Sequence, residues 1–243
     1  MKLEIVPLHL QDATGRQRPL AELSRAELSL CLDVLARIIH SNETVDILRP
    51  DEPGFGLAEI RAFREKLYAT SAPYLLAPFQ EAIEQRLQLD ERSFHFVATH
   101  EGQIVGTLRV TAPPFELSAL SPEMAEAAAE RPGHLEMGRL VVDPAFRRAY
   151  VGEKLIFGAA RWLCARTDVA GVVQICREER RSYFELYGLS PVRETPFRLS
   201  ERGDGVYYLM ATTLPVVLDR IFSAIYWAPD QLEKRQQWAA RGT

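Results

Sequence analysis

The stretch HLEMGRLVVDPAFRRAYVGEKL, residues 134–155, says most about the fold of this 243-residue chain. An acidic residue and an arginine lead into an apolar strand, which ends at Asp143-Pro144 because proline cannot continue a central ladder. Two arginines and Gly152 follow, and then an amphipathic helix begins. The stretch therefore predicts a strand, a turn and a helix, with the turn beside a reaction centre.

This turn has the composition of a phosphate-binding site. A helix N-terminus presents free backbone N–H groups and the positive end of the helix dipole, so a pyrophosphate or a phosphopantetheine phosphate can bind there. Gly152 lets the backbone approach such a ligand, and Arg147, Arg148 and Lys154 add positive charge. The alternative interpretation is an ordinary strand-to-helix turn with solvated arginines.

Hydrophobic periodicity places further elements on both sides of this unit. A helix over residues 20–39 has Ser24 and Glu27 as a capping box, and a Pro- and Gly-rich loop follows it. The remaining expected elements are short strands or helices. Helices are expected over 57–69, 74–87, 152–166, 182–187 and from 215 to 241, with a short helix and loop within 115–133. Strands are expected over 3–10, 135–142, 171–176 and 206–212, and residues 94–113 form two strands with a turn at 100–103.

The alternation of strands and helices after residue 93 predicts an α/β (α+β) fold, a mixed sheet with helices packed on it. We expect three sections. Residues 1–90 form an N-terminal helical section packed on the core, residues 91–213 form the core, and residues 214–243 form a C-terminal helical tail.

Composition excludes several classes of function. The net charge of −4 argues against a nucleic-acid binder, since such proteins rely on a basic face. No apolar run is long enough to span a bilayer, and the N-terminus lacks the apolar core of a signal peptide. Cys31, Cys164 and Cys176 are widely spaced, which fits reduced thiols in a cytoplasmic protein. The scattered histidines and cysteines do not suggest a metal site.

Three segments together resemble a known family. The order Val142-Asp143-Pro144, Arg147, Gly152 and an amphipathic helix is similar to the acyl-CoA-binding motif of the GCN5-related N-acetyltransferase (GNAT) superfamily. The segment SYFELYGLSPV, 182–192, resembles a later motif of that superfamily, and HEGQIVGTLRVT, 100–111, resembles its central hairpin. The resemblance covers about residues 90–213 and implies a mixed, mostly antiparallel central sheet flanked by helices.

Within the superfamily, two related groups are most similar to this chain. Glu136 with Arg139, and Gly106 with Arg109, resemble the acyl-homoserine-lactone synthases and the long-chain N-acyl amino acid synthases. Both groups take acyl chains from acyl carrier protein and carry extra N-terminal helices, which the front section of this chain matches. The chain departs from the superfamily at two positions. Tyr150 replaces the first glycine of the phosphate loop, and Phe184 replaces a frequent general-acid tyrosine.

The resemblance implies roles for particular residues. Glu136 would be the base that takes a proton from the attacking amine, directly or through water. Backbone N–H groups near Leu140 and Val141 would hold the thioester oxyanion. Tyr187, or Tyr183, would protonate the leaving thiolate, although packing is the usual role of a tyrosine beside a helix-ending glycine. The residues expected to bind the donor are Leu140, Val141, Val142, Arg147, Arg148, Val151, Gly152 and Lys154.

Arg139 lies three residues after Glu136, so a regular strand would send the two side chains to opposite faces. A β-bulge would bring both to one cleft. Arg139 would then pair with Glu136 or bind a substrate carboxylate, and Arg109 is the other candidate for that carboxylate. The alternative for Arg139 is a plain surface ion pair.

These residues predict an N-acyltransferase. Its donor would be an acyl thioester on acyl carrier protein or CoA, with no metal, and its acceptor the amine of an amino acid or a similar small metabolite. The arginine-rich segment 177–181 could dock an acidic carrier protein, or it is a solvated turn. Two alternatives remain: an acetyl-CoA-dependent N-acetyltransferase, and a non-catalytic acyl-thioester sensor. A long apolar tunnel beside the helix at 152–166 would favour long acyl chains, whereas a filled tunnel would favour an acetyl group. The oligomeric state is left open.

Overall fold

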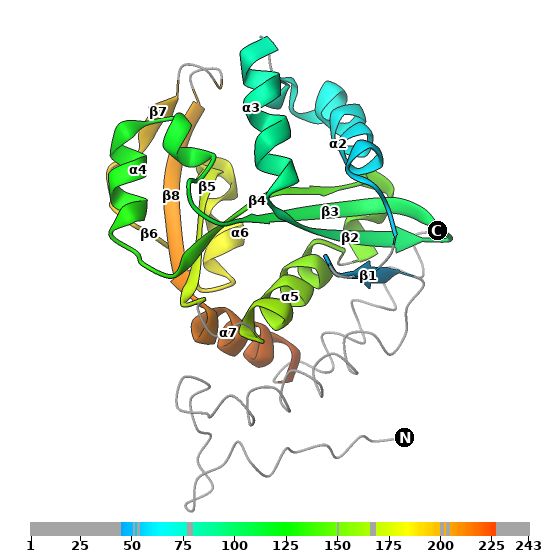
Figure 1. The fold of residues 1–243 in the computed structure, drawn as a ribbon. Coiled ribbons are helices and arrows are strands. Elements are labelled where there is room, and N and C mark those ends of the chain that lie inside the picture. Colours follow the sequence, from blue (N-terminus) through cyan, green and yellow to red (C-terminus); the bar gives the residue numbers. More distant parts are fainter. Residues whose placement is uncertain are drawn as a thin grey trace, which may run out of the picture.

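The fold is a single twisted sheet with helices on both faces (Figure 1). The structure is a computed structural model. It describes residues 45–50, 52, 54–76, 80–149, 151–165, 169–199, 202 and 205–226, without the side chains of 80–84, 148, 149 and 221–226. The strands are β1 (Asp46–Leu48), β2 (Phe94–His100), β3 (Gln103–Thr111), β4 (His134–Val142), β5 (Gly171–Arg177), β6 (Ser190–Pro191), β7 (Phe197–Leu199) and β8 (Gly205–Thr213).

Six α-helices accompany the sheet in the described part of the chain. They are α2 (Leu57–Ser71), α3 (Gln80–Glu91), α4 (Pro122–Ala129), α5 (Val151–Cys164), α6 (Arg181–Glu185) and α7 (Leu214–Tyr226). Short 3-10 helices lie at η3 (Pro73–Leu75), η4 (Leu117–Ala119), η5 (Pro144–Ala149) and η6 (Glu178–Arg180).

The sheet is mixed and mostly antiparallel, as expected. Its strand order is β1-β2-β3-β4-β5-β8-β6, and β7 also pairs with β8. Only β4 and β5 run parallel, while the other neighbouring strands are antiparallel. Because a parallel pair needs a crossover, the chain passes from β4 to β5 through α5, which packs on β2, β3 and β4.

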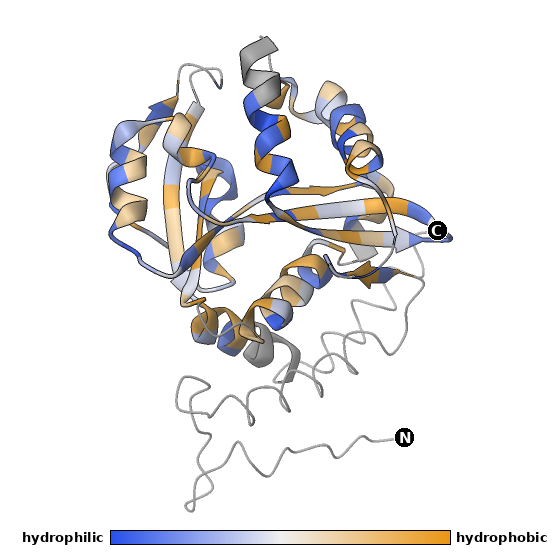
Figure 2. Ribbon diagram, viewed as in Figure 1, coloured by the Kyte–Doolittle hydropathy of each residue, from blue (hydrophilic) through white to orange (hydrophobic). Residues whose placement is uncertain are grey.

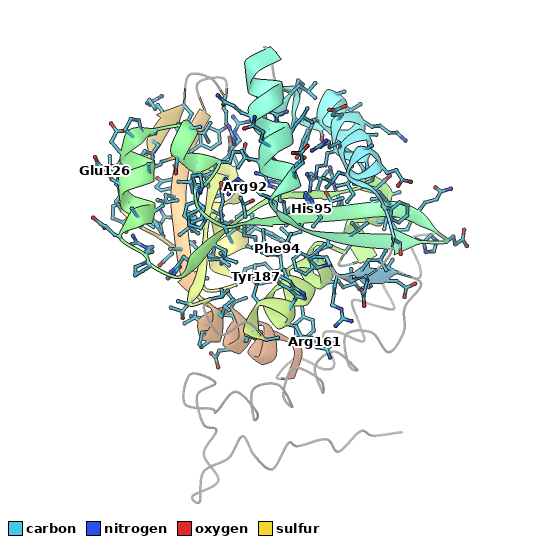
Figure 3. All side chains as sticks on the ribbon, viewed as in Figure 1. Arg92, Phe94, His95, Glu126, Arg161 and Tyr187 are labelled. Carbon is cyan, nitrogen blue, oxygen red and sulfur yellow. The ribbon has the colours of Figure 1, made fainter. Side chains whose placement is uncertain are left out.

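The two faces of the sheet carry different helices. On one face, α5 buries its apolar side against β2, β3 and β4, with α7 beside it. On the other face lie α2 and α3 (Figure 1). Alternation along β2 shows the two faces: Phe94 points toward α5 and contacts Trp162, whereas His95 points toward α2 and α3 (Figure 3). In Figure 2, α3 is largely hydrophilic, whereas α5 carries many hydrophobic residues.

The β2–β3 hairpin closes where the sequence predicts it. Glu101 and Gly102 form its two-residue turn, with φ of 49° and 75°. Positive φ at both central residues is the geometry of a type I′ turn, which matches the twist of the flanking strands. The Glu-Gly dipeptide therefore sets the register of the first long hairpin.

Most elements expected from the sequence are confirmed, with small shifts of their ends. The second front helix begins at Gln80 rather than at residue 74, because Pro73 starts a separate 3-10 turn. The expected loop before residue 57 contains β1, and β6 and β7 were not expected. These three strands are only two or three residues long, too short to show periodicity. The strand at 3–10, the helix at 20–39 and the tail beyond residue 226 lie outside the described residues, and the division at residues 90 and 213 stays a prediction.

None of the helices that the structure describes is both long enough and apolar enough to cross a membrane.

Gly106 on β3 is a position where the packing of α5 tolerates no side chain. A Cβ there would lie 2.8 Å from Val151 Cγ1 and 3.1 Å from Leu155 Cδ1. We expect Gly106→Ala to lower the free energy of unfolding by about 1–3 kcal/mol, as overpacked cores do. Guanidinium unfolding of the variant and the wild type measures this difference.

Gly138 on β4 is the matched control, because a Cβ there meets no atom within 4 Å. Gly138→Ala should change the free energy of unfolding by no more than about 0.5 kcal/mol. Equal losses in the two variants would contradict the close approach of α5 to β3.

Candidate active site

The site begins where β4 and β5 separate. The two strands pair from His134 and Gly171 only as far as Glu136 and Val173, although β4 continues to Val142 and β5 to Arg177. Beyond that point their facing edges form no ladder with each other. Peptide groups on those edges are therefore left for a ligand to bind, since buried N–H and C=O groups need partners.

A cavity of about 420 Å³ occupies this gap. Both strands and the elements above them contribute to its walls. The main lining residues are Tyr68, Ser71 and Tyr74 near α2; Glu116; Glu136 to Val141 on β4; Gln174 to Arg177 on β5; and Phe184, Arg202 and Tyr207. The volume lies in the range of small-molecule sites, which suits an enzyme with small substrates.

A β-bulge brings Glu136 and Arg139 to the same cavity. Thr107 pairs with Val141 but Arg109 pairs with Gly138, so an advance of two residues along β3 corresponds to three residues along β4. Arg139 takes up the extra residue with a φ of 55°. Both side chains therefore line the cavity, and the bulge that the spacing required is present.

Glu136 is buried, with 5% of its surface exposed. One carboxylate oxygen accepts a hydrogen bond from the backbone N–H of Glu116, and the other accepts one from Leu117 at 3.2 Å. Burial, and next the neighbouring Glu116 carboxylate, raise the pKa of Glu136 to about 7. At neutral pH, Glu136 can therefore hold or release a proton, as a general base must.

Arg139 pairs with Glu116 and not with Glu136. Its Nε and Nη2 donate to the two Glu116 oxygens, and its side chain is 6% exposed. Arg109 and Arg202 donate to the same carboxylate. Burial opposes ionisation of Glu116, but the three guanidinium groups outweigh it and hold the pKa of Glu116 well below its usual range. The alternative for Arg139 was a plain surface ion pair, but the observed pair with Glu116 is internal and multidentate.

Arg109 does not line the cavity. It is 1% exposed, and its Nη1 donates to Asp90 at 2.8 Å while its Nη2 donates to Glu116. The structure therefore gives no support to a contact between Arg109 and a substrate carboxylate. Arg109 instead links two carboxylates, that of Asp90 in α3 and that of Glu116 in the cavity wall.

Asp90 anchors the helical section to the sheet. Arg61 and Arg64 of α2 both pair with it at 3.2 Å, and Arg64 also bonds to His95. Burial and Arg64 lower the pKa of His95 to about 4, so this imidazole is neutral at pH 7. The α2 helix is thus fixed above β2 and β3, which places its Tyr68 in the cavity wall.

The expected phosphate turn has its local structure but only some of its expected contacts. Asp143 Oδ1 accepts from the Ala145 N–H at 2.9 Å and stabilises the start of η5. Arg147 is exposed, as a phosphate ligand needs to be. Gly152 is buried beside the Tyr183 hydroxyl, which a Cβ at residue 152 would approach to 3.2 Å. Tyr150 and the Arg148 side chain lie outside the described residues.

The other residues expected to bind the donor are divided between the cavity and the core. Leu140 and Val141 line the cavity. Val142 pairs with Gly106, and Val151 is fully buried against that glycine. The Lys154 side chain is also buried, 7% exposed, so it does not extend into solvent as a free charge.

Tyr187 lies away from the cavity. It is on the α5 side of the sheet (Figure 3), where it lines a narrow apolar pocket with residues of α5 and α7. Burial and Glu153 raise its pKa above the usual range, and burial raises the pKa of Tyr183 to about 12. The position of Tyr187 gives no support to the expected proton transfer to a thiolate.

Cys176 does line the cavity, but burial raises the pKa of its thiol to about 12. A thiol with this pKa is not a thiolate at neutral pH, so the structure does not favour a nucleophilic role. In the described part of the chain, no three His, Cys, Asp or Glu side chains gather in a way that could hold a metal ion.

Four buried donors in the cavity wall have no hydrogen-bond partner among the described residues. They are Tyr68 Oη, Arg139 Nη1, Gln174 Nε2 and Arg177 Nε. The sequence singled out Arg139 as a site residue, and Arg177 only as part of the arginine-rich segment 177–181. Tyr68 follows the apolar pattern of a helix and Gln174 stands in an apolar strand, so only the latter offered a signal, one polar residue in a buried run.

The mixed, mostly antiparallel sheet agrees with the fold that the resemblance implied. The family comparison agrees: the model of the acetyltransferase (GNAT) family matches residues 60–188, just over half of the chain. The chain belongs to this family, and the resemblance read from its motifs is confirmed.

Solved structures with the same fold include relatives of both synthase groups. A CoA-dependent acyl-homoserine lactone synthase, BjaI, solved with SAM and isopentyl-CoA, is 18% identical with a TM-score of 0.55, over 70% of this chain and 81% of that one. FeeM, an N-acyl amino acid synthase from uncultured soil microbes, is 12% identical with a TM-score of 0.52, over 70% and 91%.

A putative N-acetyltransferase from Lactobacillus plantarum is 16% identical with a TM-score of 0.51, over 71% of this chain and 99% of that one. No curated protein matches the chain in sequence. At these identities the solved structures support the fold alone.

Glu116 should be essential to stability, because three guanidinium groups share its carboxylate. We expect Glu116→Gln to lower the free energy of unfolding by about 3–5 kcal/mol, since it leaves buried charges without their partner. Urea unfolding measures the loss. The control is Glu126→Gln, on the outer side of α4 (Figure 3), which should change stability by less than about 0.5 kcal/mol. Similar losses in the two variants would refute the central role of Glu116.

Proposed function

We propose that the protein is an N-acyltransferase that moves an acyl group from a phosphopantetheine thioester to the amine of a small metabolite such as an amino acid. The observation that carries the proposal is Glu136, a buried carboxyl group with a raised pKa at the point where β4 and β5 separate. Membership of the acetyltransferase (GNAT) family supports the reaction class.

The donor fits the gap between the two strands. Peptide groups of β4 beyond Glu136 have no partner on β5, so they can hydrogen-bond the amides of a phosphopantetheine arm. Exposed Arg147, with Arg148 and the backbone at Gly152, would hold the phosphate end near the start of α5. Arg177 and Arg180 at the cavity would suit an acidic carrier protein as well as CoA.

The proposed transfer needs one proton acceptor and one oxyanion site. Glu136 takes a proton from the acceptor ammonium, and the neutral amine attacks the thioester carbonyl carbon. Backbone N–H groups near Leu140 and Val141, which line the cavity, stabilise the oxyanion. Glu136 releases this first proton to solvent and then accepts the second proton, from the nitrogen of the tetrahedral intermediate. The C–S bond breaks to give the amide, and the leaving thiolate takes up the second proton.

The length of the acyl group is limited by a nearly closed pocket. The apolar pocket between β4, α5 and α7 has a volume of only about 10 Å³, no more than one water requires. Met137 and Phe184 line both this pocket and the 420 Å³ cavity, so they separate the two. The filled pocket favours a short acyl group, and it supports acetyl-CoA-dependent N-acetylation as a second candidate function.

Replacing Glu136 by glutamine tests the base. We expect Glu136→Gln to lower kcat/KM by about 10²–10⁴-fold with a CoA thioester and an amine acceptor. The wild-type pH profile should rise through a limb near pH 7, the pKa to which burial raises Glu136, and the variant should lack this limb. Glu126→Gln, on the exposed face of α4, should keep both rate and limb.

The pH dependence of the free energy of unfolding also tests the raised pKa of Glu136. The pKa of Glu136 is higher in the folded protein than in the unfolded chain, so folding favours the neutral carboxyl group. The stability that this neutral group contributes is therefore lost as pH rises from about 5 through 7. Wild type should therefore lose stability relative to Glu136→Gln across that range. An unchanged rate in Glu136→Gln would refute the assignment of the base.

Met137 tests the control of acyl length. Met137→Ala should open the cavity into the apolar pocket, and we expect the ratio of kcat/KM for octanoyl-CoA over acetyl-CoA to rise about tenfold or more. Met124→Ala is the matched control, because Met124 is also buried but belongs to α4 and lines neither the cavity nor the apolar pocket. Both variants should lose about 2–5 kcal/mol of stability, so only the ratio distinguishes them. An unchanged ratio in Met137→Ala would show that Met137 does not limit chain length.

A further inference from the structure

The wall of the cavity contains a peptide group that the strand ladders on either side do not hold. It joins Arg139 to Leu140 in the β-bulge of β4, where neither residue is paired with a residue of β3. The pairing of β4 with β5 ends before it, at Glu136 and Val173. Another contact must therefore set the direction of this peptide group.

The side chain of Thr107 on β3 makes that contact. Thr107 is fully buried, and its hydroxyl group donates to the carbonyl oxygen of Arg139, with 3.5 Å between the two oxygens. Arg64 Nε donates to the same hydroxyl oxygen at 3.2 Å, so the hydroxyl proton is left for the carbonyl. In a trans peptide the C=O and N–H bonds point in opposite directions. Because the Arg139 carbonyl points toward β3, the Leu140 N–H points away from β3, into the cavity that Leu140 lines.

Arg64 of α2 holds the Thr107 hydroxyl group in turn. Arg64 is 4% exposed, its Nη1 donates to Asp90 at 3.2 Å, and its Nη2 lies 3.0 Å from His95 Nδ1. With Nε on Thr107, all three nitrogens of this planar group are engaged, so its orientation is fixed. A chain of hydrogen bonds therefore runs from α2 through Thr107 to the strand that lines the cavity.

We propose that Thr107 and Arg64 are positioning residues for the oxyanion site, and that they direct the Leu140 N–H at the thioester oxygen. The inference rests on the proposed function and adds to it two side chains that lie behind the cavity wall. Arg139 is then fixed twice, at its side chain by Glu116 and at its carbonyl by Thr107. A donor that is held in place before the reaction stabilises the developing charge without reorganising.

The vibration of a bound thioester carbonyl tests the proposal without relying on turnover. Infrared spectra of acetyl-CoA labelled with carbon-13 at the thioester carbonyl would be recorded free and bound to the full chain, with no amine present. We expect the carbonyl band to move to lower frequency on binding, because a hydrogen bond to the oxygen weakens the C=O bond. Thr107→Val keeps the shape of the side chain but removes the hydroxyl group, so it should lose about half of this shift or more, whereas Thr107→Ser should keep it.

Steady-state kinetics with acetyl-CoA and an amine measures the same effect in the transition state. Thr107→Val should lower kcat about tenfold or more and keep KM for acetyl-CoA within about twofold, because the N–H binds the oxyanion more strongly than the neutral carbonyl. The limb of the pH profile near pH 7 should remain, since Glu136 is unchanged. A purely structural role of Thr107 would lower stability without separating kcat from KM.

Thr212→Val is the matched control, because Thr212 on β8 is also buried and its hydroxyl group also donates to a backbone carbonyl, that of Thr213 at 3.4 Å. It should keep both the infrared shift and kcat. Thr107→Ala removes the same hydroxyl group as Thr107→Val and replaces that variant if it does not fold. The proposal is overturned by a wild-type protein that binds acetyl-CoA with no shift of the band, or by variants without the Thr107 hydroxyl group that keep the full shift.

The positioning proposal and the proposed function fail in different ways. If the protein binds no CoA thioester and transfers no acyl group from one, the proposed function fails and the positioning of a thioester fails with it. If acetyl-CoA is bound and its acyl group is transferred equally well without the Thr107 hydroxyl group, the function stands and Thr107 does not position the oxyanion site.

Discussion

β4 and β5 are hydrogen-bonded over three residue pairs and then separate, and the candidate site depends on this separation. Parallel strands that stay paired satisfy each other's peptide groups and leave no space between them. Here β5 stays paired to β8 and β4 to β3, so each strand remains fixed while the gap between them opens. The cavity, the free peptide edge and the position of Glu136 at the apex all follow from this geometry.

Charge around Glu116 holds the site in place. A non-glycine residue at positive φ is strained by about 1–2 kcal/mol, and Arg139 adopts this φ in the β-bulge, where two bonds to Glu116 fix its side chain. The same carboxylate, together with burial, raises the pKa of Glu136, while its own remains low among three guanidinium groups. Glu116 therefore stays ionised and Glu136 titrates near neutrality, because the two carboxyl groups differ in the number of nearby cations.

Much of the fold could be predicted from the sequence because its signals are local. The Glu-Gly turn needs only positive φ at two residues, and Pro144 ends β4 because a proline has no N–H to donate. Helical periodicity over Val151–Cys164 is long enough to show an apolar face. The short strands β1, β6 and β7 carry no such signal, since pairing with a neighbour alone defines them.

The sequence by itself determined the order of strands and helices, the family motifs, and the importance of Glu136 and Arg139, because these depend on residue spacing along one chain. Only the tertiary structure decided that Arg139 pairs with Glu116, that Arg109 lies beneath the cavity, and that Tyr68 joins its wall. Those contacts join residues 7 to about 70 positions apart. Spacing in sequence cannot specify such pairs, since they form only when the sheet brings separate elements together.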